Sequence, residues 1–292
     1  MLVSFLGGYK MFSKINRNLE RKAFPNLSYT MSRKKTIIIC SVILLSAIIS
    51  VFVVVLVKKT LNKGGHVNSH PQKGGYVYKK PNPKLCEHPD GIDLSHHNVA
   101  YDWGKVDAKF IYIRATMGNR IVDKRYNTHR KSAKKRHIPI GAYHFLEANT
   151  TAEVQFRFFS SVVKPNDIQL RPMLDVEESK YWKAPKGFTD NDAHRLIRKW
   201  CDLCKKKYGV APIIYTTEKL YHRYKMNQGF SDCIWWVANY NNIPDYHKRC
   251  IIPFTLHQYS HIKYVEGFYG FVDCNRFGKG KSVVDLYIKK PK

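Results

Sequence analysis

The chain has 292 residues and a mass of 34.1 kDa, enough for one large domain or two small ones. It carries 50 Lys and Arg against 22 Asp and Glu, a formal net charge of +28, which favours contact with anionic polymers or lipids. The sequence contains no paired Cys/His finger spacing, no aromatic RNA-binding signature and no heptad repeat with a basic region, so nucleic acid is not the predicted partner.

The N-terminal part of the chain is strongly basic and contains one long apolar run. Residues 1–84 hold 15 Lys and Arg but a single acid, Glu20. Within this part, residues 36–57 (TIIICSVILLSAIISVFVVVLV) carry no charge between basic flanks, and 22 such residues are enough to cross a bilayer. A cleaved signal peptide has a shorter apolar region and a small-residue cleavage site. The run therefore predicts an uncleaved transmembrane signal anchor, with a cleaved leader as the alternative.

The flanking charges predict how this span is oriented. Eight Lys and Arg precede it and three follow it closely, so the positive-inside rule places the N-terminus in the cytoplasm. Met31, in MSRKKT, is a second possible start. The chain is therefore predicted to be a single-pass membrane protein whose remainder lies on the periplasmic or extracellular side. Its predicted segments are a basic segment at 1–35, the anchor at 36–57, a flexible basic linker at 58–85 and a folded domain at 86–292.

From Pro89 onward, short β-rich runs alternate with helix-like stretches. The first five β-rich runs span 91–95, 110–116, 138–145, 170–177 and 211–217. Helix-like stretches lie between them, a rhythm typical of βαβ units and a parallel sheet. These stretches span about 124–136, 151–163 and 190–208.

The rhythm changes after residue 217. Three more β-rich runs follow, with one short helical candidate near 218–226, and they span 233–240, 254–260 and 270–277. The pattern predicts an α/β fold, a barrel of about eight strands that lacks its late helices. An open doubly wound sheet is the alternative, although no glycine-rich phosphate loop follows the first strand.

Two carboxylates stand one residue apart in the stretch RPMLDVEES. Side chains at i and i+2 of a strand share one face, so Asp175 and Glu177 are predicted on the same side as Met173. They come at the C-terminal end of the strand, where barrel enzymes place their chemistry. Neighbouring like charges raise one of the two pKa values and so supply a protonated acid beside an ionised partner. A structural ion pair with Arg171 or Lys180 is the alternative.

Two further acids close short apolar runs in the same way. Asp93 ends the run in GIDLSHH, and Asp273 ends the run in FVDCNRF. Four carboxylates that converge on one cleft are typical of a glycosidase site, in which one acid protonates the leaving oxygen and another group stabilises the oxocarbenium ion.

A set of motifs in fixed order extends this interpretation. GIDLSHHNVAYDW, FIYIRATMGNRIVDKRY, IPIGAYHF, PMLDVE, IIYTT, WWVANY, HQYS and VDCNRF follow one another over about residues 88–280. Their order and spacing resemble glycoside hydrolase family 25, the Chalaropsis-type lysozymes or N-acetylmuramidases. The resemblance implies an irregular, flattened TIM-like barrel, (β/α)5(β)3. It also implies hydrolysis of the β-1,4 bond between N-acetylmuramic acid and N-acetylglucosamine in peptidoglycan, with no cofactor or metal.

The same resemblance implies roles for single residues. Glu177 would be the general acid, and Asp175 would stabilise charge and assist the substrate's own N-acetyl group as an internal nucleophile. Asp93 and Asp273 would complete an acidic floor. Whether a protein carboxylate or the substrate amide attacks is left open by the sequence.

Four aromatic residues are candidates for sugar contacts. Tyr143 in GAYHF and Tyr240 in WWVANY match family positions along the cleft, Trp236 shares the strand face of Tyr240, and Tyr215 in IIYTT is a further candidate. One departure from the family is Met117, which stands in ATMG where an acid is common.

Two other functions are kept as alternatives. His96, His97, His144 and Asp93 could form a metal site, as in a metal-dependent polysaccharide deacetylase, although no H-x-x-x-H spacing is present in this region. The chain could also be a catalytically silent, membrane-tethered peptidoglycan-binding module.

Six cysteines lie outside the predicted span, which leaves disulfide pairing open. Cys201 and Cys204 form a C-x-x-C inside a predicted helix with no second such pair, so structural or buried thiols are predicted there.

Overall fold

A computed structural model describes residues 79–243 and 245–289, which belong to one compact unit, Ser69–Lys292. The predicted basic segment, the predicted span and most of the predicted linker lie outside the described residues. Within the described ranges, no helix is both long and apolar enough to cross a membrane.

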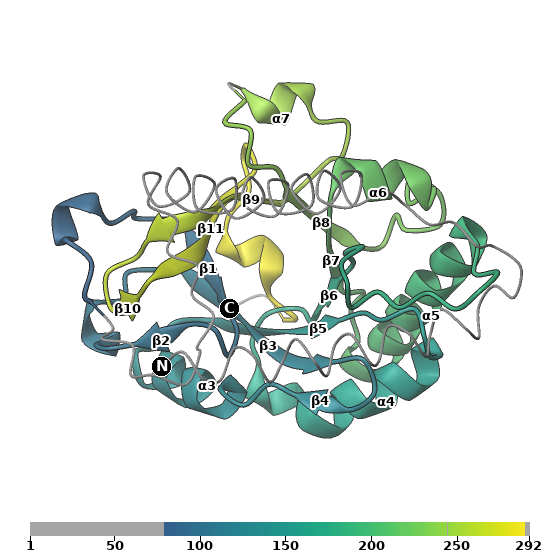
Figure 1. The fold of residues 1–292 in the computed structure, drawn as a ribbon, viewed down its shortest axis with the longest axis horizontal. Helices are drawn as coiled ribbons and strands as arrows, with labels where there is room; N and C mark the ends of the chain where they lie inside the picture. Colours follow the sequence, from purple (N-terminus) through teal and green to yellow (C-terminus); the bar gives the residue numbers. More distant parts are fainter. Residues whose placement is uncertain (1–78, 244, 290–292) are drawn as a thin grey trace, which may run out of the picture. The chain divides into compact units, whose positions relative to one another are not determined.

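Eight strands close into a barrel (Figure 1). Seven of them run parallel to one another. The last strand in the chain is antiparallel; it lies between the first barrel strand and the barrel strand that precedes it in sequence, and so closes the barrel. The predicted barrel is therefore confirmed, and the open doubly wound sheet is wrong. In order round the barrel the strands are β1 (Gly91–Leu94), β3 (Phe110–Met117), β5 (Ile140–Phe145), β6 (Met173–Asp175), β7 (Ile213–Thr216), β8 (Ile234–Ala238), β9 (Leu256–Tyr264) and β11 (Phe271–Phe277).

Three short strands lie beside this barrel. β4 (Ile121–Val122) extends the sheet from the end of β3, and β2 (Val99–Ala100) pairs with β10 (Phe268–Tyr269).

The described residues contain five α-helices, each of which follows one of the strands β3 to β8. They are α3 (Tyr126–Lys135), α4 (Ala152–Val162), α5 (Asp190–Tyr208), α6 (Glu218–Arg223) and α7 (Tyr246–Arg249). The first three confirm the predicted long helices. The last two are short, which agrees with the sequence after residue 217, where only one short helical candidate was found. Four 3-10 turns complete the described structure: η1 (Pro83–Leu85), η2 (Trp103–Lys105), η3 (Pro165–Asp167) and η4 (Val283–Leu286).

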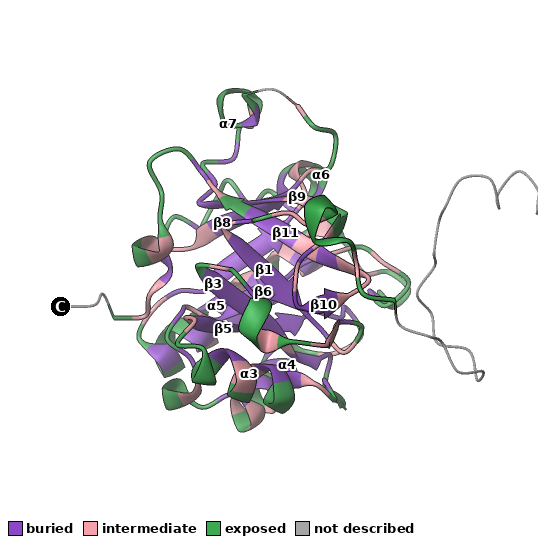
Figure 2. Cartoon of the chain, turned by 90° about the vertical axis from the view of Figure 1, so that its left-hand side faces the viewer, coloured by how far each residue is buried: buried purple, intermediate pink, exposed green. Residues whose placement is uncertain are grey.

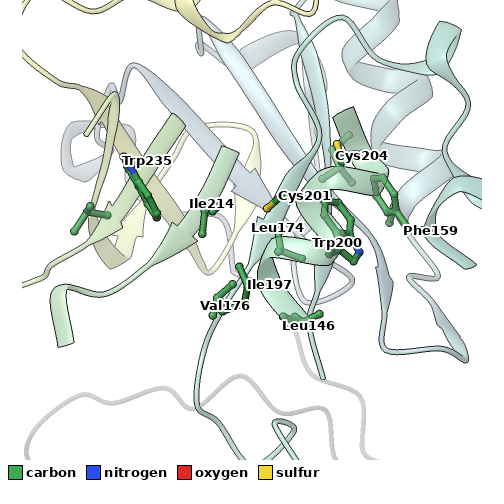
Figure 3. Close-up of a cluster of buried hydrophobic side chains, with 14 of the residues drawn as sticks. Leu146, Phe159, Leu174, Val176, Ile197, Trp200, Cys201, Cys204, Ile214 and Trp235 are labelled. Atoms are coloured by element: carbon green, nitrogen blue, oxygen red, sulfur yellow. The ribbon is translucent and has the colours of Figure 1, made fainter. Parts of the chain in front are cut away.

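Helix α5 shows how local sequence sets these elements. It begins at a capping box, in which Thr189 and Asp192 satisfy each other's backbone N–H groups. It ends at Gly209, whose φ of 79° lies in the left-handed region that glycine adopts readily. Between these ends, buried side chains recur every three or four residues and pack on the outer face of the barrel, where Trp200 and Cys201 lie beside Leu174 (Figure 3).

The C-x-x-C pair lies on this buried face. Cys201 and Cys204 are both fully buried, which fits the interpretation of structural thiols, and the six cysteines of the described residues are all free thiols.

The barrel interior is a second core, filled by large side chains. Phe110 and Tyr112 on β3 lie across glycines of the two adjacent strands, and a Cβ at Gly91 or Gly141 would come within 2.2 or 2.1 Å of the respective rings. Glycine is thus required at both positions because the aromatic rings occupy the space above the backbone. Figure 2 shows the barrel strands buried at the centre and exposed surface concentrated on the helices and loops around them.

Candidate active site

A pocket of about 210 Å³ opens at the end of the barrel where the parallel strands finish. All four predicted carboxylates line it, together with three of the four predicted aromatic residues. The complete lining is Asp93, Ser95, His97, Arg114, Tyr143, Phe145, Met173, Asp175, Glu177, Tyr215, Tyr240, Gln258 and Asp273.

A larger cavity of about 840 Å³ lies elsewhere, along the outer surface of α4 and α5. Its charged side chains are largely neutralised in pairs, such as Lys199 with Glu153 at 3.5 Å and Arg195 with Asp192. It holds no set of converging carboxylates, so the chemistry of the side chains assigns the site to the smaller pocket.

Strand β6 and the residues that follow it position the first pair of acids, Asp175 and Glu177. Met173 points into the barrel core, Leu174 packs on the outer face, and Asp175 ends the strand facing the pocket. The strand has three residues instead of the eight predicted, because its ladder with β5 and β7 covers only Met173 to Asp175. Beyond it, the Val176 N–H still bonds to the Tyr215 carbonyl at 2.9 Å, which leads the chain out to Glu177 at the pocket edge.

Burial and mutual repulsion raise the pKa values of this pair. For Asp175, burial is the main cause, followed by the charge of Glu177, and the pKa lies well above its usual range. Burial also raises the pKa of Glu177, while a hydrogen bond with Asp175 opposes the shift. Asp175 is the more deeply buried of the two, and its Oδ1 has no hydrogen-bond partner among the described residues. Both pKa values are therefore raised, so the pair retains a proton at a pH at which isolated carboxyl groups would be ionised.

The second pair comes from the first and last barrel strands. Asp93 and Asp273 face each other in the ladder between β1 and β11. Burial raises the pKa of Asp93 to about 6, and burial together with the charge of Asp93 raises that of Asp273 well above its usual range. Asp273 was predicted at the end of a strand, but it lies near the start of β11, which reaches the same rim because it runs in the opposite direction.

Asp93 is held by two neutral amides. Its Oδ2 accepts hydrogen bonds from Gln258 Nε2 at 2.9 Å and Asn275 Nδ2 at 2.8 Å. Asn275 is oriented in turn by Trp236, whose Nε1–H donates to its Oδ1 at 2.9 Å. These donors favour the ionised form of Asp93 and work against the effect of burial.

The predicted aromatic residues lie at different depths. Tyr143 and Tyr215 line the pocket wall, and Tyr240 lies at its mouth with 44% of its surface exposed. The hydroxyls of Tyr215 and Tyr240 both donate to Gln258 Oε1, the former at 2.8 Å, which turns the Gln258 amide nitrogen toward Asp93. Trp236 is fully buried in the barrel core beneath the pocket and does not line it.

Sequence reasoning missed a cation in this site. Arg114 on β3 lines the pocket and bonds through Nε to Asp123 Oδ2 at 2.9 Å. Its charge lowers the pKa values of Asp175 and Glu177 against the effect of burial and so favours their ionised forms. The sequence feature that could have identified Arg114 is its position as the single charged residue in an otherwise mainly apolar strand, FIYIRATM.

The histidines do not form the predicted alternative metal site. His144 points to the outer face of the barrel, where its ring nitrogens bond to Thr116 and Gln155 and its ring stacks on Trp200. Burial lowers its pKa to about 4. The described residues hold no group of three His, Cys, Asp or Glu arranged for a metal ion. Since His144 and Asp93 lie on opposite faces of the strands, they cannot bind one ion together.

A second pocket of about 380 Å³ shares Glu177, Tyr215 and Tyr240 with the first. Its other walls are mainly polar side chains that follow β7 and β8, and they include one acid and one cation, Glu218 and Lys219, beside Asn239. Glu177 therefore lies between an acidic pocket and a neutral, polar one.

Comparison with known families agrees with this geometry. The model of glycosyl hydrolases family 25 matches residues 92–268, which include three of the four carboxylates and most of the barrel. The chain belongs to glycosyl hydrolases family 25. The fourth carboxylate of this family 25 chain, Asp273, lies shortly beyond the matched range, on the closing strand.

Bacterial proteins are moderately similar to this chain in sequence. The chain is 29% identical over 196 residues to the uncharacterised protein YegX of Escherichia coli K12, across 64% of this chain and 68% of that protein. It is 26% identical over 193 residues to the autolytic lysozyme of Clostridium acetobutylicum, across 65% of this chain and 56% of that protein.

Solved structures show a similar fold. The lysozyme of Streptomyces coelicolor aligns with a TM-score of 0.58 and 26% identity, across 66% of this chain and 93% of that one. A family 25 glycosyl hydrolase of Bacillus anthracis aligns with a TM-score of 0.58 and 24% identity, across 72% of this chain and 97% of that one.

Proposed function

We propose that this family 25 chain is a muramidase that cleaves the β-1,4 bond between N-acetylmuramic acid and N-acetylglucosamine in peptidoglycan. The observation that carries the proposal is the convergence of Asp93, Asp175, Glu177 and Asp273 on one pocket, with raised pKa values. Five helices after five of the eight strands also fit a (β/α)5(β)3 barrel. Similarity to bacterial lysozymes supports the substrate class.

Glu177 is the general acid in this proposal. It is the member of the first pair that reaches the pocket edge, where a glycosidic oxygen can approach it. Glu177 gives the proton that the pair retains to the leaving oxygen. This transfer leaves Asp175 ionised beneath the sugar at the moment when positive charge develops at its anomeric carbon.

The acidic pocket suits the sugar that becomes positively charged. Asp93 and ionised Asp175 lie on its walls and would stabilise an oxocarbenium ion. Asp175 is also placed to hold the substrate's N-acetyl group as an internal nucleophile. The neutral pocket on the other side of Glu177 would receive the leaving sugar, so that the scissile bond lies at Glu177 itself.

Digestion of purified peptidoglycan by the full chain tests the reaction. The expected products are muropeptides that end in reducing N-acetylmuramic acid, identified by reducing-end analysis and mass. A chelator should leave their release unchanged. Binding of the polymer without release would favour a silent wall-binding module, and release of acetate that stops with chelator would favour a deacetylase.

The place of action is proposed from the N-terminal sequence. Residues 36–57 are proposed to anchor the chain as a single-pass membrane protein, with the N-terminus in the cytoplasm and the barrel on the periplasmic or extracellular side. The chain should then stay in membranes washed with alkaline carbonate. Its extraction into the wash would show a peripheral or secreted protein instead.

A further inference from the structure

The barrel end opposite the catalytic pocket carries an unusual density of cations. Helices that connect parallel strands run back from the pocket end, so α3 and α5 end at the far side of the barrel. The chain there reads Lys134-Lys135-Arg136 across the end of α3 and Lys205-Lys206-Lys207 at the end of α5, with no acid in either run. We call this end of the barrel the basic end.

Hydrogen bonds show that the segments of the basic end are neighbours. The chain that follows α4, residues 163–172, bonds to both sides. The Ile140 N–H at the start of β5 donates to Gln169 Oε1 at 3.1 Å, and the hydroxyl of Tyr208 at the end of α5 donates to the Val163 carbonyl at 2.8 Å. Arg171 also bonds through Nη1 to the Ala211 carbonyl at 3.1 Å. The two cationic runs therefore flank one continuous surface.

Most of these cations lack a counter-ion. Lys134, Lys135, Arg136, Lys206 and Lys207 are exposed, and none makes an ion pair with a described residue. Two of the acids close to them are already paired, since Asp167 bonds Arg130 at 2.6 Å and Asp232 bonds Arg198 and Lys205. A helix dipole favours a cation in the last turn, but three adjacent cations repel one another, so the dipole does not explain both runs.

The C-terminal segment adds to the same surface. It crosses the end of the barrel beside residues 169–171, where the Arg171 N–H donates to the Leu286 carbonyl at 2.8 Å and the Ile288 N–H donates to the Gln169 carbonyl at 2.9 Å. Lys279, Lys281 and Lys289 are exposed on this segment, and Val284 presents an apolar side chain that is 44% exposed.

We propose that the basic end docks on the anionic headgroups of a phospholipid bilayer. Cations around an exposed apolar side chain suit a membrane surface, where each Lys or Arg gains from the negative surface potential. The acidic catalytic pocket lies at the opposite end of the barrel, so docking directs it away from the lipid. An anionic wall polymer bound at the basic end would instead leave the pocket facing away from that polymer.

Acetylation of lysines in the full chain tests this docking. The chain is mixed with preformed vesicles of phosphatidylcholine alone, or with about one third phosphatidylglycerol, and treated with a short pulse of acetylating reagent. On the anionic vesicles, Lys134, Lys135, Lys206, Lys207 and Lys281 should react at least about 3-fold more slowly. The protection should disappear in about 1 M salt, which screens the charges. Lys124 and Lys186 near the pocket end serve as internal references whose rates stay constant.

Matched variants separate this surface from general charge. In K134Q/K135Q/K206Q/K207Q the protection of Lys281 should be lost. It should persist in K124Q/R157Q/K180Q/K186Q, which removes four exposed cations from the sides and the pocket end.

Two outcomes would overturn the proposal. One is equal acetylation on neutral and anionic vesicles, and the other is protection by soluble anionic wall polymer with none by vesicles. The docking surface itself does not depend on the proposed muramidase reaction. Digestion of peptidoglycan without lipid reports on that reaction separately, so failure of either idea leaves the other measurable.

Discussion

Replacing Glu177 by Gln is expected to lower kcat on peptidoglycan by about 10³-fold, which corresponds to about 4 kcal/mol of transition-state stabilisation. The amide keeps the size and the hydrogen-bonding shape of the side chain but cannot release a proton to the glycosidic oxygen. Binding of the polymer should be retained, because the pocket walls are unchanged. Turnover of defined peptidoglycan fragments, measured beside binding to intact sacculi, checks both statements.

The neighbouring acid provides a matched control. Glu178 is one residue further along, but it bonds to Arg223 and Tyr224 and does not line the pocket. E178Q should change kcat by less than about 3-fold and cost at most about 1 kcal/mol of stability through the weakened ion pair. Similar activity of E177Q and E178Q would show that Glu177 is not the acid.

Replacing Asp93 by Asn is expected to make the protein more stable at neutral pH while impairing catalysis. Burial raises the pKa of Asp93 from 3.8 to about 6. Between these values the folded chain keeps a proton that the unfolded chain has lost, so the free energy of unfolding falls as the pH rises through this window. The loss amounts to about 3 kcal/mol above pH 6. An Asn at this position does not ionise, so the variant escapes this loss.

The measurement compares denaturant unfolding of wild type and D93N between pH 4 and pH 8. The stability difference in favour of D93N should grow by up to about 3 kcal/mol across this range. Asp107 is a suitable control because its side chain is 86% exposed, and D107N should follow the wild-type curve. A constant difference between D93N and wild type at every pH would contradict a raised pKa at Asp93.

Much of the fold could be predicted because it depends on local patterns. The three long helices have N-terminal caps or apolar spacing that can be read directly, as in α5 with its capping box at Thr189 and its glycine stop at Gly209. The β-rich runs were also found in the right order. Strand ends were less certain, and β6 was overestimated because its length is set by its neighbours β5 and β7, which a single run does not show.

The candidate site was predicted only in part. Carboxylates at the ends of apolar runs are conspicuous because a charge rarely follows a buried strand without a reason. Gln258 and Asn275 have no such signal, since a neutral amide in a strand is as common on the solvent side. Their importance appears only when the closing strands bring both amides to Asp93.

Trp236 shows another limit of pattern reading. Alternation along a strand correctly gives the side on which a residue lies, and Trp236 does face the barrel interior. Alternation does not tell how far a side chain lies below the surface of the pocket. Trp236 lies beneath the pocket, where it orients Asn275. Its contribution to the site therefore passes through a hydrogen bond to another side chain.

The closing strand also affects when the site can exist. Asp93 on β1 and Asp273 on β11 become neighbours only when the last barrel strand inserts between the first strand and β9. Contacts between residues so distant in sequence form late, because a long loop must lose its freedom before they are made. A nascent chain that has reached only β9 has both members of one acid pair but a single member of the other. The four acids are thus brought together only when β11 has joined the barrel, so a chain that stops before β11 lacks the finished pocket.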